Sequence, residues 1–106
     1  MEGMELLCFQ MITFVGSARS NFIEAIEFAR QLAFEEANKR IDEGKAAFIE
    51  GHKIHGKILA ECASNTDSSI PLLLVHAEDQ LMSAETFQIL ASEFIDLYRI
   101  VHKQNK

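Results

Sequence analysis

The chain has 106 residues, of which 48% are hydrophobic and 25% are charged, and its formal net charge at pH 7 is −6. This composition is typical of a single folded domain, 1–106, and excludes a largely disordered chain. No apolar run is long enough to span a bilayer, and the net negative charge argues against an extended nucleic-acid footprint.

Apolar residues recur at steps of three and four along the first part of the chain, which predicts two α-helices at about 4–30 and 34–63. The first helix carries its apolar stripe at Met4, Leu7, Met11, Val15, Ala18, Phe22, Ala25 and Ala29. The second carries its stripe at Phe34, Ala37, Ile41, Phe48, His55, Ile58 and Cys62. No Gly, Pro, Asn or Asp separates the two stripes. One continuous helix would be too long for a small domain to cover, so we expect a turn at Gln31 to Ala33.

Six small polar residues, Ser64 to Ser69, mark the clearest break and precede a third predicted helix at about 70–102. We expect Ser68 or Ser69 to cap this helix, and Pro71 suits its first turn. The tail from Lys103 to Lys106 is polar and is expected to fray. The predicted fold is therefore all-α, an antiparallel up-down-up three-helix bundle.

The third helix is too apolar for a surface helix, because the run Leu72–Val75 leaves no polar face. Two neighbouring helices cannot bury it completely, so we expect it to pack against copies of itself or another chain. A polar stripe at His76, Asp79, Ser83 and Thr86 occupies one face. Such a stripe suits a wet oligomer axis or a cleft between subunits, where Asp79 needs a cation, a donor or water.

The histidines are the candidate reactive groups. A neutral imidazole carries a lone pair that can attack phosphorus, which makes His76 a candidate nucleophile. A hydrogen-bonded structural pair with Asp79 is the more frequent use of such neighbours. His52 and His55, one helical turn apart, can hold a metal ion, although a partly exposed polar pair is the preferred interpretation. His102 lies in the predicted tail and is expected to be solvated.

Cys8 and Cys62 lie in apolar stretches and lack the spacing of metal or redox sites. We expect both to be buried as small hydrophobic residues. The start of the chain carries Glu2 and Glu5 and does not resemble a secretory signal, so we expect a reducing, cytoplasmic environment.

Several segments resemble one known family. Leu72 to Met82, with the core His-Ala-Glu-Asp-Gln-Leu-Met, closely resembles the active-site stretch of the lactose/cellobiose-type enzyme IIA of the bacterial phosphoenolpyruvate-dependent sugar phosphotransferase system. The other matching segments are Phe9 to Ser20, Phe34 to Ala37, His52 to Ile54 and Ile95 to Tyr98. The resemblance therefore covers nearly the whole chain in one register.

The resemblance implies a phosphocarrier that assembles as a homotrimer through the third helix. The residue matching His76 accepts a phosphoryl group on Nε2 from the phosphocarrier protein HPr, then passes it to a cysteine of the IIB subunit during sugar uptake. The residue matching Asp79 lies at the trimer axis, where three copies bind a divalent ion such as Mg²⁺. The membrane subunit IIC selects the sugar and is reached only indirectly, so we expect no residue here to contact carbohydrate.

The chain departs from the family pattern at three places. Gln80 replaces a second histidine that many members carry, Leu32-Ala33 replaces a Gly-Asp or Gly-Asn pair, and the loop Ser64 to Ser69 is less charged. These changes leave the proposed acceptor histidine in place.

The groups around the phosphoryl site are less well defined. No arginine stands beside His76 in the sequence, so hydrogen bonds to the phosphoryl group would come from Gln80, Ser83, His52 or His55. We expect docking of partners to rest on an apolar patch around the histidine.

Two other functions stay open from the sequence. One is a non-catalytic helical adaptor or regulator built on the same trimer. The other is a metal-binding helical bundle that uses His52, His55, His76 and Asp79.

Overall fold

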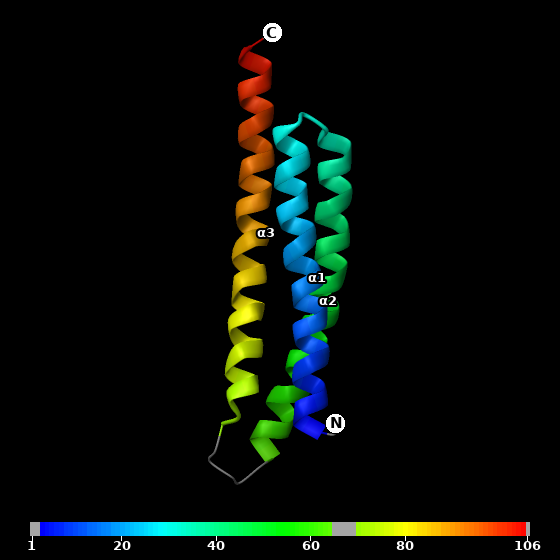
Figure 1. Cartoon of the computed structure of the whole chain (residues 1–106), viewed down its shortest axis with the longest axis vertical. Coiled ribbons are helices and arrows are strands. Elements are labelled where there is room, and N and C mark those ends of the chain that lie inside the picture. Colours follow the sequence, from blue (N-terminus) through cyan, green and yellow to red (C-terminus); the bar gives the residue numbers. More distant parts are fainter. Residues whose placement is uncertain (1–2, 65–69, 106) are drawn as a thin grey trace.

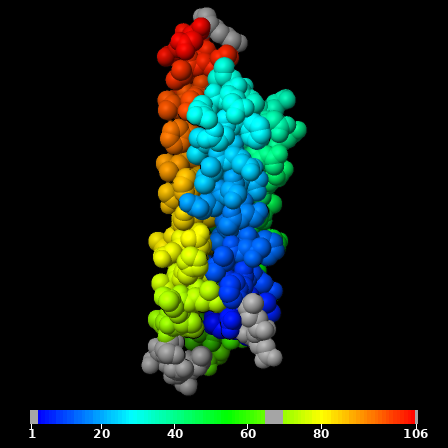
Figure 2. Space-filling view, viewed as in Figure 1, coloured from blue at the N-terminus to red at the C-terminus, as the bar shows by residue number. Residues whose placement is uncertain are grey.

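Three α-helices make up the computed structural model, which describes residues 3–64 and 70–105 (Figure 1). They are α1 (Gly3–Arg30), α2 (Phe34–Ser64) and α3 (Leu72–Gln104). The described residues contain no strand, which confirms the predicted all-α class. The molecule is a slender rod of 62 × 19 × 17 Å (Figure 2). None of the described helices combines the length and apolar character that a membrane span requires.

α1 is the helix around which the core is built. It packs against both other helices, whereas α2 and α3 touch each other least. Successive helices run in opposite directions, with α3 on one side of α1 and α2 on the other (Figure 1). The buried stripe of α1 has the predicted spacing of three and four residues. Its members are Cys8, Met11, Val15, Ala18, Phe22, Ala25 and Ala29.

Two glycines allow α1 and α2 to approach closely. A Cβ atom on Gly44 would lie 2.5 Å from the Phe22 ring, and one on Gly51 would lie 2.7 Å from the Val15 side chain. Any larger residue at either position would force a neighbour in a close-packed core to move. The need for glycine at these two positions could not be predicted from the sequence, because it arises from the contact between two helices.

The chain reverses direction at residues 31–33, where the sequence predicts a turn. The Leu32 amide donates to the Ala29 carbonyl at 2.9 Å, and the Ala33 amide donates to the Phe28 carbonyl at 2.9 Å. This pair of bonds is the Schellman motif, which requires a left-handed residue just after the helix. That residue is Leu32, with φ of 66°. The turn was hard to recognise because leucine occupies the place where glycine is usual.

α3 begins at Leu72, two residues later than predicted, and continues to Gln104, two residues further. Pro71 is the N-cap residue, with φ of −61° and ψ of 139°, rather than part of the first turn. Its carbonyl accepts from the Leu74 amide at 3.0 Å. The expected caps, Ser68 and Ser69, lie outside the described residues. The tail predicted to fray is helical as far as Gln104, since the last turn carries His102 and Lys103, which favour a helix C-terminus.

Candidate functional site

His76 lies on the outer surface of the second turn of α3, where its side chain is exposed. Leu74 and Ala77 face the core, so the helix directs His76 away from it. Leu72 and Val75 beside it are 82% and 46% exposed. A hollow of about 430 Å³ opens at the same end of the rod, between the first turns of α1 and the start of α3. Its lining is Met4, Glu5, Cys8, Phe9, Pro71 and Leu73. This end therefore presents an imidazole within an apolar surface.

The predicted polar stripe is present, but its members do not form one bonded network. Asp79 and Thr86 are exposed and Ser83 is half-buried. The Thr86 hydroxyl donates to the Met82 carbonyl of its own helix at 3.1 Å. Within residues 70–105 no hydrogen bond or ion pair joins His76 to Asp79, so the structural pair considered from the sequence does not form in a single chain.

The side of α3 that carries Asp79 is exposed and largely apolar, with Asp79, Thr86 and Glu93 as its polar members. Leu72, Val75, Asp79, Met82, Thr86 and Ile89 follow one another at steps of three and four. Met82 is 64% exposed and Ile89 is 60% exposed. The patch continues through Leu90, Phe94, Leu97, Ile100 and Val101. An apolar face of this length on a monomer indicates a surface that another chain covers.

His55 and Glu78 connect α2 to α3 through their side chains. His55 Nε2 donates to Glu78 Oε1 at 2.6 Å, and the two side chains are 16% and 36% exposed. The direction follows from chemistry, because an ionised carboxylate only accepts. Glu78 lies within the motif that resembles the family, yet its partnership with His55 was not predicted. The available signal was His55 itself, a polar ring at an inward position of a predicted apolar stripe.

The histidine pair of α2 does not form the expected alternative metal site. His52 is exposed and stacks on Phe48 with ring centroids 6.4 Å apart, whereas His55 bonds to Glu78. Among the described residues, no three His, Cys, Asp or Glu side chains are arranged to hold a metal ion. Within the described part of one chain, His52, His55, His76 and Asp79 are therefore not gathered as the metal-binding bundle considered from the sequence would require.

The two cysteines differ in environment. Cys8 is fully buried, and its burial raises the pKa of the thiol, with added effects from Cys62 and Glu78. Cys62 is exposed, so the prediction that both are buried is wrong for it. Cys62 lies in the last turn of α2, beyond Ile58, which is the last buried residue of that helix.

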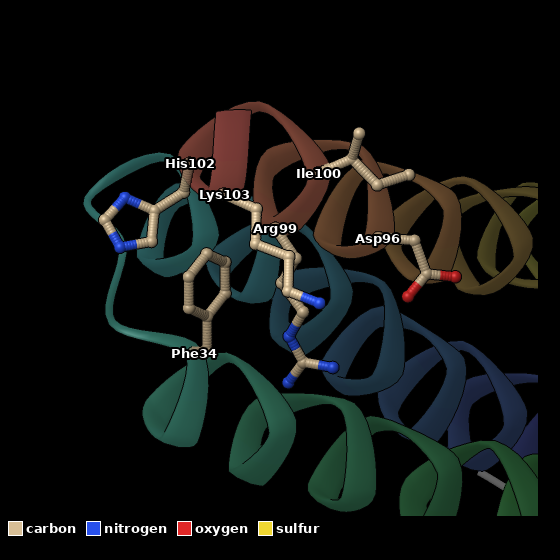
Figure 3. A pocket seen from close by; sticks show the side chains of 6 residues that line it. All are labelled: Phe34, Asp96, Arg99, Ile100, His102 and Lys103. Atoms are coloured by element: carbon tan, nitrogen blue, oxygen red, sulfur yellow. The ribbon is translucent and has the colours of Figure 1, made fainter. Parts of the chain in front are cut away.

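Another hollow lies at the opposite end of the rod (Figure 3). It measures about 530 Å³ and is lined by Phe34, Asp96, Arg99, Ile100, His102 and Lys103. The Arg99 guanidinium stands 5.2 Å from the Phe34 ring centroid, and the His102 ring lies 6.2 Å from it. His102 is thus half-buried against Phe34, because α3 continues past it, and is not solvated as predicted. A guanidinium covering an aromatic ring and basic residues at a helix C-terminus have structural explanations, so this hollow is not by itself a reactive site.

Known proteins resemble this chain over nearly its full length. Residues 6–99 match the family model described as the lactose/cellobiose-specific IIA subunit of the PTS system. The chain is 34% identical to the lichenan-specific phosphotransferase enzyme IIA component of Bacillus subtilis over 103 residues, which cover 97% of this chain and 94% of that protein. It is 31% identical to the lactose-specific EIIA component of Staphylococcus aureus, over 92% of this chain and 95% of the relative.

A solved structure shows the same fold. The PTS cellobiose-specific enzyme IIA from Bacillus anthracis superposes with a TM-score of 0.90 at 38% sequence identity. The match covers 97% of this chain and 94% of that chain. Sequence and structure thus point to the same group of proteins.

Proposed function

Because this chain belongs to the lactose/cellobiose-specific IIA family of the phosphotransferase system, we propose that it carries a phosphoryl group on His76 during sugar uptake. Members are phosphotransferase subunits, so a role in sugar phosphotransfer follows from membership. The exposure of the His76 side chain is the observation that carries the proposal, because phosphoryl transfer between proteins needs a nucleophile that a partner can reach.

The proposed reaction has two displacement steps. The lone pair on His76 Nε2 attacks the phosphorus carried by HPr, and the donor takes back the electron pair of the bond that breaks. A thiolate of the IIB cysteine then attacks the same phosphorus, the P–N bond breaks, and His76 regains its lone pair. Neither step needs a general base, since the neutral imidazole is already nucleophilic. We place both steps in the cytoplasm.

The surroundings of His76 support docking through apolar contacts. Leu72 and Val75 precede His76 on α3 and are exposed, and the hollow lined by Phe9 and Leu73 opens at the same end. Apolar groups at the centre of an interface exclude water from the reacting atoms. The net charge of −6 would not attract a phosphorylated donor, so this apolar surface is the attractive feature.

We propose that three chains assemble through the exposed apolar face of α3. The spacing of three and four residues along that face is the pattern by which helices pack around a common axis. His76 is three positions from Asp79, about 60° around the helix, so it lies at the edge of this face and stays reachable. Assembly would bury the apolar patch and leave the imidazole at a subunit boundary.

Asp79 is the residue that would hold the proposed axial ion. It is exposed on the apolar face and has no bonded partner among the described residues, so each chain offers one free carboxylate. Three such carboxylates at the axis repel one another unless a cation lies between them. Mg²⁺ prefers oxygen ligands and fits this set. The axial ion would join the three subunits and would take no part in phosphoryl transfer.

Phosphoenolpyruvate, enzyme I and HPr provide the direct test, read by intact mass. We expect the wild-type chain to gain one acid-labile phosphoryl group, and the His76→Ala variant to gain none while it keeps its helical content. A folded wild-type trimer that takes no phosphoryl group would contradict the proposal and favour the adaptor.

A further inference from the structure

The hydrogen bond from His55 to Glu78 joins the two helices that touch each other least. At 2.6 Å between Nε2 and Oε1 it is a short bond, and the two side chains are 16% and 36% exposed. A charge-assisted bond in a partly dry setting is stronger than a bond between exposed groups. No other side-chain hydrogen bond reaches α3 from another helix in the part of the chain that the structure describes.

The first turns of α3 have few other restraints. The N-cap residue is Pro71, which has no side-chain capping bond, and Leu72 is 82% exposed. Leu74 and Ala77 anchor the inner side of these turns against the core. Apolar contacts have little directional preference, so they resist rotation of the helix about its own axis less than a hydrogen bond does.

We propose that His55 and Glu78 are positioning residues, which fix the rotation and height of the α3 turn that presents His76. The inference rests on the proposed function of His76 as the phosphoryl acceptor. Glu78 is two positions from His76, about 200° around the helix, so one side chain faces α2 while the other faces outward. The pair therefore acts on the acceptor through the backbone of one turn and does not touch the reacting atoms.

The size of the effect follows from helix geometry. An imidazole about 6 Å from the α3 axis moves by about 1 Å when the helix rotates by about 10°. A misplacement of about 1 Å can slow a group transfer by up to about 100-fold. Because Leu74 and Ala77 retain part of the restraint, we expect loss of the bond to lower the rate constant of phosphoryl transfer by about 5-fold.

The test measures single-turnover phosphoryl transfer from excess phospho-HPr to wild-type and variant chains, with kcat taken as the rate constant at saturating phospho-HPr and KM as the half-saturating concentration of phospho-HPr. Glu78→Ala removes the acceptor, and His55→Phe removes the donor but keeps a ring of similar size. We expect each to lower kcat by about 5-fold with KM for phospho-HPr within about 2-fold of wild type. The double variant is expected to be no slower than either single variant, since both remove the same bond.

Two further variants separate positioning from general stability. Glu78→Gln keeps an oxygen that accepts from His55 and should stay within about 2-fold of the wild-type kcat. Glu50→Ala removes the surface ion pair with Lys53 on the same helix and should not change kcat. If Glu78→Ala does not keep its helical content, the comparison rests on His55→Phe and Glu78→Gln.

A kcat of His55→Phe equal to that of the wild type would overturn the positioning role. So would an equal fall of kcat in Glu78→Gln and Glu78→Ala. In both cases the proposed function would stand, because His76 would still accept the phosphoryl group. A change in melting temperature with no change in kcat would also overturn it, because that is a purely structural effect. A wild-type chain that takes no phosphoryl group would overturn the proposed function and this inference together.

Discussion

Small residues at single positions set the distance between α1 and α2. Gly44 faces the Phe22 ring, which is fully buried, and Gly51 faces Val15, which is also fully buried. Neither neighbour can turn into solvent to make room. Gly56 lies in the same helix but has open space where its Cβ atom would be. The same substitution at these positions should therefore have opposite effects on stability.

Gly44→Ala is expected to destabilise the protein by about 1–2 kcal/mol, because overpacking exceeds the gain in helix propensity. Gly56→Ala is expected to stabilise it by about 0.5–1 kcal/mol through helix propensity alone. Urea unfolding followed by circular dichroism, at one fixed chain concentration, measures both. Stability of Gly44→Ala at or above that of the wild type would mean that α1 and α2 can separate at this point.

The site could be predicted from the sequence only in part. Periodicity placed His76 and Asp79 on one face of a helix, and the family resemblance supplied their expected roles. The partnership of His55 with Glu78 was not predictable, because helical periodicity shows that a residue points inward but not which residue of another helix it meets. Cys62 was misplaced for a related reason, since a stripe can extend beyond the last turn that a neighbour covers.

At the scale of elements, the helices follow from the spacing of apolar residues, and their ends follow from local backbone chemistry. The turn after α1 was predicted because a small domain could not cover one continuous helix of that length. Its sequence contains no Gly, Pro, Asn or Asp, the residues that usually mark a turn. The structure gives the reason, since Leu32 adopts a left-handed conformation with φ of 66° and is 47% exposed. A non-glycine residue in that region is strained by about 1–2 kcal/mol.

Leu32→Gly is expected to stabilise the chain, because glycine adopts the left-handed conformation without that strain. Loss of the half-exposed side chain offsets part of the gain, so the net change should be about 0.5–1 kcal/mol. This corresponds to a rise of a few degrees in melting temperature, roughly 2–6 °C, when chain concentrations are matched. Leu32→Ala is the control, since it removes the side chain but keeps the strain, and it should not raise the melting temperature. An equal rise in both variants would contradict the conformational explanation.

At the scale of the whole molecule, the apolar face of α3 is the feature that a single chain leaves unexplained. Val75, Met82 and Ile89 are spaced by seven residues and are all exposed. Leu72, Asp79 and Thr86 repeat with the same spacing beside them. Seven-residue spacing brings equivalent positions of several helices to one axis. In the proposed trimer, the axis between Leu72 and Ile89 is mostly apolar and Asp79 is its one acidic layer, whereas the same spacing beyond Ile89 reaches Glu93 and Asp96.

Asp79→Leu is therefore expected to keep the trimer and to strengthen it. The variant removes three carboxylates that repel one another and adds apolar surface at the axis. Ile89→Asp is the matched opposite change, because it puts three carboxylates into an apolar layer and should weaken assembly. Sedimentation over a range of chain concentrations gives the oligomeric state of each. Metal analysis of the same samples should find that Asp79→Leu no longer retains a divalent ion. Monomers of Asp79→Leu would show that the ion, rather than the apolar face, holds the subunits together.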